Sequence, residues 1–309
     1  MMKKWVIGIV IAGFTLGIFP YEYIMAATKL KSDMPIEVLF DGRKIQFDVK
    51  PKMVQNTVLV PIRFVSEKLE AKLSVNGKQI TITKDKNILK LTMNSNAASF
   101  NGKAVTLIQP AIVDNGRTLV PLRAISEGLG VKVEWDQVTK FVWIGKKIVP
   151  ELRDILEPVN AEPYKKYFEG REFYFKSVEN YEKKTAEKAY IITEKHFPFS
   201  INGEHFYRYD MAYDLSGTPF IKATTTDKGS MATQIYYIGK TSKLRYRASA
   251  YGYQVNIGDF RIHYYNITEY SDLISIGDEN YDKYKIQEAD YIGIAADYDG
   301  LILIQNPFK

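Results

Sequence analysis

Hydrophobic and polar residues alternate along several short stretches in the first half of the chain. The runs at residues 79–83 and 132–135 place apolar side chains at every second position, which predicts half-buried β-strands. Asp41-Gly42 and Asn101-Gly102 lie between apolar stretches of this kind, and such dipeptides are typical of two-residue hairpin turns. The pattern therefore predicts antiparallel strands joined by tight turns.

Two segments have the helical period instead. Each carries apolar residues at i, i+3 and i+7, which predicts a helix with one buried stripe, and a proline suited to the first helical position precedes each stripe. Gly130 is suited to end the second helix in the left-handed conformation. The first repeat has Glu70 at that place, so we expect its helix to end in another way. The stripes are Ile62, Val65 and Leu69, then Leu122, Ile125 and Leu129, preceded by Pro61 and Pro121.

An internal repeat relates these elements. Residues 59–69 return as residues 119–129 with an offset of 60 residues, and residues 40–43 match residues 100–103 without a gap. A fixed offset indicates one structural unit used twice. We therefore expect an α+β N-terminal domain at residues 33–147, with an antiparallel sheet and two helices.

Tyrosine usage changes sharply in the second half. Twenty of the 22 tyrosines lie between Tyr164 and Tyr298, which indicates a separately built core. Prolines interrupt the stretch before them, so we expect a linker at residues 148–163. The tyrosine runs are typical of strands, and they predict a mainly antiparallel β C-terminal domain at residues 164–309.

The first residues have the order of parts of a secretory signal peptide. Lys3 and Lys4 precede an apolar run at residues 5–19, and small residues follow at Ala26 and Ala27. The run is shorter than the roughly 20 residues of a membrane-spanning helix. We expect a signal peptide at residues 1–27 and a secreted or extracellular protein without a stable membrane span. A retained anchor is the alternative.

Composition excludes several classes of function. The chain has no cysteine, so it has no disulfide framework, thiol nucleophile or lipidated N-terminal cysteine. The net charge of +6 is spread along the chain, which suits an anionic polymer but lacks the concentrated basic patch of a nucleic-acid-binding protein. We expect no nucleic-acid partner.

The second repeat carries a long ordered motif. The motif comprises residues 100–103, 114–125, 129–130 and 133–136, and it resembles the copper amine oxidase N-terminal-like domain, or stalk domain, of secreted proteins from Gram-positive bacteria. The resemblance spans about residues 36–146. It implies an antiparallel sheet wrapped on a helix and an accessory role, because in that family copper and the modified tyrosine cofactor belong to a separate, larger catalytic domain.

The oxidase chemistry itself finds little support in the residues. Residues 180–182 and 280–282 approach the Asn-Tyr-acid part of the cofactor motif but lack its threonine. Copper in those enzymes needs three histidines with a His-x-His pair, whereas this chain has only His196, His205 and His263. His196 precedes a Phe-Pro pair, and His205 and His263 lie in alternating runs typical of strands. We interpret them as ordinary histidines and expect no metal and no cofactor.

Nine tyrosines in strand-like runs are the candidate binding residues. Tyrosine on a sheet either packs across strands or lines a platform for sugar rings or peptides, and the sequence leaves both interpretations open. The candidates are Tyr207, Tyr209, Tyr236, Tyr237, Tyr246, Tyr251, Tyr253, Tyr264 and Tyr265.

These observations predict a secreted or cell-surface, non-catalytic binding or spacer protein, associated with the cell wall. Its expected partners are a cell-wall polysaccharide or another surface protein, bound by the C-terminal domain. Two alternatives stay open. One is a secreted hydrolase of a cell-wall polymer, using carboxylates such as Glu204, Asp210 and Asp214. The other is a structural subunit of an extracellular layer that assembles through strand edges.

Overall fold

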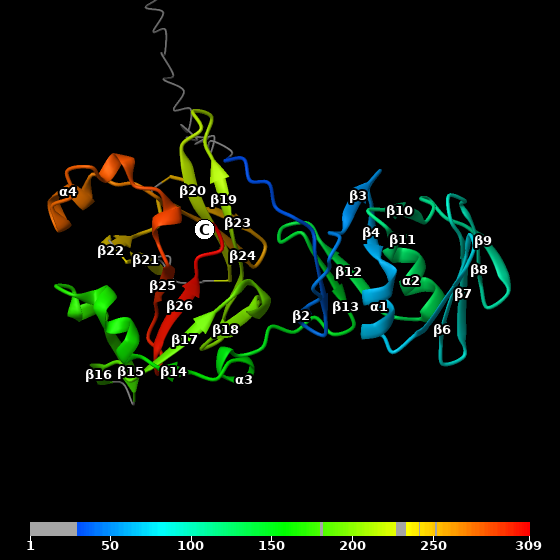
Figure 1. Cartoon of the computed structure of the whole chain (residues 1–309), viewed down its shortest axis with the longest axis horizontal. Coiled ribbons are helices and arrows are strands. Elements are labelled where there is room, and N and C mark those ends of the chain that lie inside the picture. The colour runs from blue at the N-terminus through cyan, green and yellow to red at the C-terminus, as the bar shows by residue number, and fades with distance from the viewer. Residues whose placement is uncertain (1–29, 180–181, 227–232, 241, 251) are drawn as a thin grey trace, which may run out of the picture.

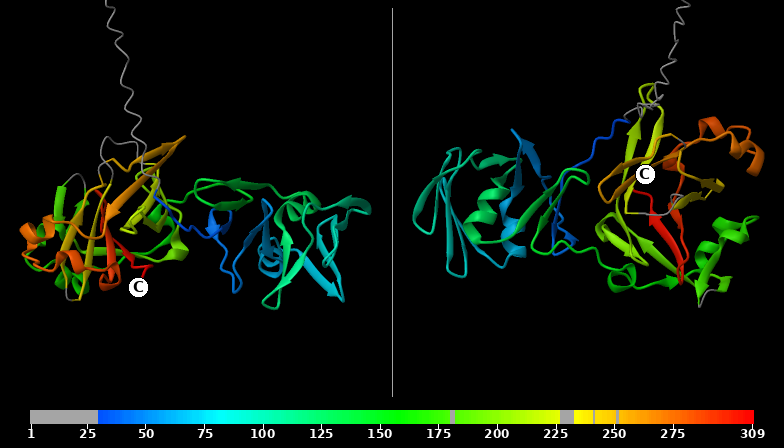
Figure 2. Two further views of the ribbon diagram at one scale, coloured as in Figure 1. Left: turned by 90° about the horizontal axis from the view of Figure 1, so that it is seen from above. Right: turned by 180° about the vertical axis from the view of Figure 1, so that it is seen from behind.

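The computed structural model describes residues 30–309, except residues 180–181, 227–232, 241 and 251. The expected signal peptide at residues 1–27 and the candidate Tyr251 lie outside the described residues. The described chain forms an N-terminal part, residues 36–147, beside a C-terminal part that holds the rest (Figures 1 and 2).

The N-terminal part contains three small sheets and two helices. The helices are α1 (Ile62–Lys68) and α2 (Leu122–Leu129). One sheet has the order β12 (Val133–Asp136), β13 (Phe141–Ile144), β1 (Glu37–Phe40), β2 (Arg43–Lys44). A second has the order β10 (Ile112–Asp114), β11 (Arg117–Pro121), β4 (Thr57–Pro61), β3 (Lys52–Val54). The third runs β5 (Lys72–Asn76), β6 (Gln79–Lys84), β7 (Asn87–Thr92), β8 (Ala97–Phe100), β9 (Lys103–Thr106).

The hairpin turns follow the sequence. Asp41-Gly42 joins β1 to β2, and Asn101-Gly102 joins β8 to β9, with positive φ at both central residues of each turn. Two positive φ angles match the twist of the flanking strands, so these predicted hairpins are confirmed. Asn115-Gly116 makes a third such turn, and Gln55-Asn56 makes its counterpart in the first repeat without a glycine.

The helix ends differ from the expectation at two places. Pro61 and Pro121 are the N-cap residues, one position before the helix, and each is also the last residue of a strand. Gly130 ends α2 with φ +65° as expected. The expectation for Glu70 was wrong, because Glu70 also takes the left-handed conformation, with φ +56°. The shared backbone geometry of the two repeats therefore overrides the residue type.

One apolar core joins the two repeats. Both helical stripes are buried in it, together with strand residues from all three sheets. Trp135 is only half-buried, although we expected it in the core. Arg123 and Glu127 are both exposed on α2 and form no ion pair in the described part of the chain.

The C-terminal part is a sandwich of two sheets. The six-stranded sheet has the order β14 (Val159–Asn160), β17 (Lys188–Ile192), β26 (Leu301–Gln305), β25 (Tyr291–Ala295), β21 (Gln234–Gly239), β22 (Ser242–Arg247). The five-stranded sheet has the order β18 (Phe199–Ile201), β19 (Glu204–Tyr213), β20 (Pro219–Thr225), β24 (Phe260–Asn266), β23 (Val255–Ile257). β15 (Lys176–Glu179) and β16 (Glu182–Thr185) form a separate two-stranded hairpin, and the Val178 backbone N–H donates to the carbonyl oxygen of Tyr298 at 2.7 Å.

Short helices complete this part: α3 (Leu152–Ile155), α4 (Ser271–Ile276) and 3-10 segments at Glu162–Phe168, Glu172–Tyr174, Glu194–His196, Tyr281–Lys283 and Ile286–Glu288. The predicted fold class, an α+β N-terminal part followed by a mainly antiparallel β part, is confirmed. The β1–β13 and β17–β26 pairs are parallel.

The six-stranded sheet is buried on both faces. Along β21, Ile235 and Tyr237 point into the core between the two sheets, whereas Tyr236 and Ile238 point to the opposite face. That second face is covered by the segment at residues 161–175. A sheet covered on both sides needs apolar side chains at consecutive positions, which is why the strand reads as an uninterrupted apolar run.

Residues 148–163, expected as a linker, are packed against the C-terminal part. Leu152 and Ala161 have no exposed surface, Glu151 bridges Ser200, and β14 pairs with β17. The prolines here end short elements, but the segment between them is packed against the C-terminal part. The expectation of a linker at residues 148–163 is therefore corrected.

A buried junction joins the two parts. Leu39, Phe141 and Trp143 of the β1–β13 pair form one buried apolar cluster with Tyr207 of the C-terminal part, and the Phe141 and Tyr207 ring centres are 6.5 Å apart. Beside them, the buried Arg208 donates two hydrogen bonds to Asp210, at 2.7 and 2.6 Å, and further ones to the carbonyl oxygens of Pro35 and Thr139. The junction therefore combines an apolar contact with a satisfied buried ion pair.

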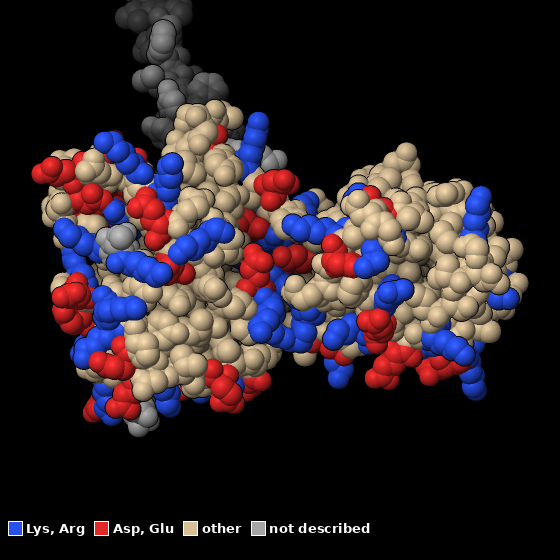
Figure 3. Space-filling view, in the orientation of Figure 1, with Lys and Arg blue, Asp and Glu red and all other residues tan. Residues whose placement is uncertain are grey.

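The surface in Figure 3 mixes cationic and anionic side chains over both parts, without a single-sign patch on that face. Within the described ranges, no helix is long and apolar enough to span a membrane.

Candidate functional site

The candidate tyrosines are mostly buried. Six of them are at most 9% exposed, which favours for these six the packing interpretation that the sequence left open. The physical reason is the two-layer packing, which buries both faces of the six-stranded sheet and most of the five-stranded one. The buried six are Tyr207, Tyr209, Tyr236, Tyr237, Tyr264 and Tyr265.

Most of the candidates belong to three separate apolar clusters. Tyr209, Tyr237 and Tyr265 are in the core between the sheets, and the Tyr237 hydroxyl donates to the carbonyl oxygen of Asn266 at 3.0 Å. Tyr253 and Tyr264 belong to a small outer cluster around Phe220. Tyr207 belongs to the junction. These residues stabilise the fold.

Tyr236 and Tyr246 do meet, in a pocket of about 240 Å³ on the covered face of the six-stranded sheet. We call it the aromatic pocket. Four rings line it, those of Phe173, Tyr174, Tyr236 and Tyr246. The other lining residues are Lys176, Val178, Lys183, Gln234, Ile294, Ala295, Ala296, Asp297, Gly300, Leu301 and Ile302.

The rings form a continuous contact series. The ring centre of Tyr174 lies 5.6 Å from that of Phe173, 6.2 Å from that of Tyr236 and 5.5 Å from that of Tyr246. These separations are in the range of favourable aromatic pairs. Phe173 is 72% exposed, so the series runs from the buried Tyr236 out to an open ring face.

The β15–β16 hairpin supplies a cationic wall. Val178 is opposite Lys183 in the pairing register, and Lys176 is two residues before Val178. Side chains two apart on a strand share a face, so both lysines and Val178 lie on the pocket side. Both lysines are exposed and have no ion pair within the described residues. Gln234 of β21 and Asp297 of the turn after β25 add polar groups.

A glycine in the neighbouring strand makes room for Tyr236. A Cβ atom at Gly293 would overlap the Tyr236 ring. Gly293 is opposite Tyr236 in the antiparallel pairing of β21 with β25. The absence of a side chain there lets the ring lie flat across the strand and form the floor of the aromatic pocket.

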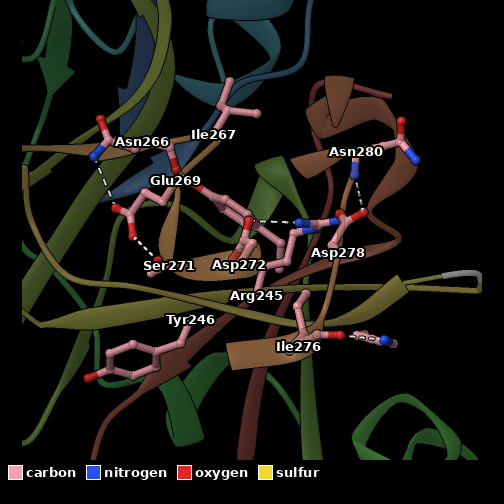
Figure 4. A network of polar contacts seen from close by, with 12 residues as sticks. Arg245, Tyr246, Asn266, Ile267, Glu269, Ser271, Asp272, Ile276, Asp278 and Asn280 are labelled. Atoms are coloured by element: carbon pink, nitrogen blue, oxygen red, sulfur yellow. Dashed lines mark hydrogen bonds and ion pairs between the residues drawn. The ribbon is translucent and has the colours of Figure 1, made fainter. Parts of the chain in front are cut away.

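A buried ion-pair network fixes the strand that carries Tyr246. Arg245 and Arg247 flank Tyr246 on β22, and both donate to the carboxylate of Asp272, at 2.7 and 2.6 Å. Arg245 also pairs with Asp278. Figure 4 shows Tyr246 pointing away from this network, as alternation along a strand requires. The network therefore holds β22 in place from the side of the strand opposite to the Tyr246 ring.

Burial raises the pKa of the Tyr246 hydroxyl, with a smaller contribution from Tyr174. Burial likewise raises the pKa of Tyr236. Both phenols therefore stay neutral at neutral pH. They present ring faces and hydroxyl groups, not anions.

The histidines do not gather. His196 lies in the 3-10 segment at Glu194–His196, where its Nδ1 accepts a hydrogen bond from the Thr193 backbone N–H at 2.9 Å. His205 and His263 lie on β19 and β24. Over the described ranges, no group of three or more histidine, aspartate or glutamate side chains is placed to hold a metal ion.

The three acids of the hydrolase alternative have other partners. Asp210 is held by the buried Arg208, and Asp214 accepts hydrogen bonds from Ser216 and Thr218 within a turn. Glu204 accepts a hydrogen bond from Thr233.

The turn after β25, which ends at Asp299-Gly300, connects β25 to β26 as an antiparallel hairpin.

Sequence reasoning missed Phe173, Tyr174 and the two lysines of the aromatic pocket. They lie in a 3-10 segment and a polar hairpin, which lack the alternating pattern used to select candidates. The run of three aromatic residues at positions 173–175, between Glu172 and Lys176, was the available signal.

The comparisons bear on the N-terminal part. Residues 39–144 match the family model described as the copper amine oxidase N-terminal domain, and no curated protein matches the chain. In amine oxidases this domain is not by itself catalytic. The match covers both repeats and all three sheets described above, and residues 145–309 lie outside it. The N-terminal part of this chain is therefore a copper amine oxidase N-terminal-like domain.

Proposed function

We propose that this chain is an extracellular, non-catalytic binding protein in which the N-terminal part serves as a spacer and the C-terminal part binds a cell-wall polysaccharide. The aromatic pocket is the observation that carries the proposal. It is the place where candidate tyrosines come together with an exposed ring and with polar groups.

The chemistry of the aromatic pocket suits a sugar ring. The apolar face of a pyranose stacks on an aromatic face, and its hydroxyl groups need hydrogen-bond partners at the edge. Phe173 and Tyr174 supply the face, and Gln234 and Asp297 supply the edge. Lys176 and Lys183 add positive charge, which suits a sugar that carries a carboxylate or a phosphate.

The same pocket gives little support for hydrolysis. Glycoside hydrolysis needs two carboxyl groups, about 5–10 Å apart. Asp297 is the one carboxylate among the described residues that line the aromatic pocket. A binding role therefore fits this pocket better than a catalytic one.

The test is retention on purified, insoluble cell wall. Phe173→Ala and Tyr246→Ala should each weaken retention about fivefold, because one stacked ring contributes about 1 kcal/mol. Tyr270→Ala is the matched control, since Tyr270 is 61% exposed and does not line the aromatic pocket. Equal loss for all three variants would contradict the proposal, and release of soluble sugar would favour the hydrolase.

A salt series separates stacking from charge attraction. The Debye length falls to about 3 Å at 1 M salt, so a purely electrostatic interaction should disappear there. Retention that persists at 1 M salt and still depends on Phe173 would support the aromatic contact. Retention that vanishes with salt would assign binding to the net positive charge.

A further inference from the structure

A second recess lies in the N-terminal part, in the second repeat. It is a groove of about 650 Å³ between the β3–β4 hairpin, helix α2 and strand β12. We call it the second-repeat groove. Its floor is apolar, with Ala124, Leu107 and Val58, and Trp135 lines one wall. This volume lies within the usual range of ligand pockets.

The internal repeat provides a comparison within the same molecule. The counterpart in the first repeat is a pocket of about 90 Å³, lined by Pro61, Ile62, Arg63, Leu73, Val75, Gly116, Arg117 and Thr118. The positions 60 residues away in the sequence, Pro121, Leu122, Arg123, Val133, Trp135, Asn56, Thr57 and Val58, all line the second-repeat groove. The two recesses are therefore the same site in two copies of one unit, and one is several times larger.

The first difference is at the floor. The first repeat has Phe64, which packs edge-on against Phe47 with ring centres 5.6 Å apart. The second repeat has Ala124 and Leu107 at the equivalent positions. Replacing two rings by smaller side chains leaves the space that forms the groove.

The second difference is at the rim. Arg117 in the first-repeat pocket forms an ion pair with Asp48 at 2.5 Å. The equivalent residues of the second repeat are Thr57 and Ile108. Ile108 is 67% exposed, and Met53 beside the groove is 42% exposed. The second-repeat groove therefore has exposed apolar groups where its counterpart has an ion pair.

The rim also carries two charged side chains that form no ion pair within the described residues. Arg123 and Glu127 are exposed and line the groove, and neither has an ion pair in the described part of the chain. Strands β3 and β12, on either side of the groove, are both edge strands of their sheets as described. Edge strands leave backbone N–H and C=O groups free for an added strand.

We propose that the second-repeat groove binds an extended peptide segment of another surface protein. One large apolar side chain of that segment fills the space over Ala124. An acidic residue beside it pairs with Arg123, and a basic residue pairs with Glu127. The peptide backbone adds to the free edge of β3 or β12.

A peptide fits the groove better than a sugar. The groove is lined by aliphatic side chains together with polar ones such as Gln55, Asn56 and Gln109. A sugar ring carries hydroxyl groups around its whole edge, and those that face the aliphatic side chains would lose their partners, which costs free energy. An extended peptide places an apolar side chain on the floor and its backbone at the strand edges. The rim charges complement charged neighbours in such a segment.

The experiment uses a displayed library of random nine-residue peptides, selected on the full chain. The closed variant T57R/I108D restores the ion pair of the first repeat at the rim, and A124F restores its ring at the floor. Both variants introduce side chains that the first repeat already has at the equivalent positions. The control is Val113→Asp, because Val113 is the repeat counterpart of Met53, is 57% exposed and does not line the groove.

We expect enriched peptides with Trp, Phe, Leu or Met beside an acidic residue. They should bind the native chain and V113D equally, and lose at least tenfold in affinity on T57R/I108D. Binding should also shift the fluorescence of Trp135. If T57R/I108D melts at the same temperature as the native chain, the loss of affinity does not come from unfolding.

Three results would overturn the proposal. One is the absence of enriched peptides, and another is equal binding to the native and closed chains. The third is self-association that the closed variant abolishes, which would assign the groove to a second copy of this chain. Retention on cell wall through Phe173 is measured separately, so failure of either proposal leaves the other standing.

Discussion

Glu70 and Gly130 occupy the same position in the two repeats, and both end their helix in the left-handed conformation, at φ +56° and +65°. A residue with a Cβ atom is strained in that conformation by roughly 1–2 kcal/mol, whereas glycine is not. The first repeat therefore contains a strained position that the second repeat has relieved.

Replacing Glu70 with glycine should stabilise the protein by about 1 kcal/mol, because the strain is removed and no contact of Glu70 is lost from the described structure. The measurement is the midpoint of urea unfolding followed by tryptophan fluorescence. Gly130→Ala is the matched control and should lower the midpoint. A lower midpoint for Glu70→Gly would contradict the assignment.

The helix stripe gives a second prediction. Ile125 is 1% exposed within the N-terminal core, so Ile125→Asp would bury an unpaired charge at a cost of several kcal/mol. Lys140→Asp should cost under about 1 kcal/mol, since Lys140 is half-buried and its ammonium group contacts the face of the Trp135 ring without an ion pair in the described part of the chain. Thermal unfolding of both variants checks this, and comparable losses would sink the core assignment.

The network behind Tyr246 gives a third. Asp272→Asn removes the charge partner of the fully buried Arg247 and should destabilise the protein by about 3–5 kcal/mol. Asp282→Asn should change little, because Asp282 is exposed and has no partner within the described residues. Calorimetry compares the two. The Asp272 variant should also lose retention on cell wall when assayed below its unfolding temperature, because Tyr246 is no longer held.

His196 predicts a pH dependence. Burial lowers the pKa of its imidazole to about 4, with smaller contributions from Lys195 and Arg43. The unfolded chain has the ordinary value near 6.5 and binds more protons than the folded chain between these values. Stability should therefore fall as the pH drops from about 6.5 to 4.

The variant His196→Asn should reduce this slope, because it removes the group that the unfolded chain protonates. Urea midpoints at pH 4.5, 5.5, 6.5 and 7.5 provide the measurement. The carbonyl of His196 accepts a hydrogen bond from Arg43 of the N-terminal part, so loss of stability at low pH should appear at the junction first. An unchanged slope in the variant would assign the pH dependence to other groups.

The junction gives the last prediction. A fragment of residues 33–147 should fold, because both helical stripes and their core lie within it. It would nevertheless expose part of Leu39, Phe141 and Trp143, which form one buried cluster with Tyr207 in the whole chain. We expect native-like circular dichroism, a lower melting temperature and a red-shifted emission from Trp143. An unfolded fragment would show that the junction is part of the folding unit.

The sequence by itself determined the local features of the N-terminal part. Two-residue turns at Asp41-Gly42 and Asn101-Gly102 depend on residues that tolerate positive φ, and helix stripes depend on a period that is visible without any contact. The repeat added an internal check, because each unit could be compared with the other. The end of α1 at Glu70 was the exception, since the shared fold imposed a strained conformation on it.

The tertiary structure alone decided the fate of the tyrosines and the location of the recesses. A period of two shows that a strand has two faces, but it does not show whether the second face meets water or another layer. Tyr237 and Tyr246 look alike in sequence, yet one lies in the sandwich core and the other lines a pocket made partly by residues 173–183. Pockets arise where separate segments leave space between them, and that space depends on packing between residues far apart in the chain.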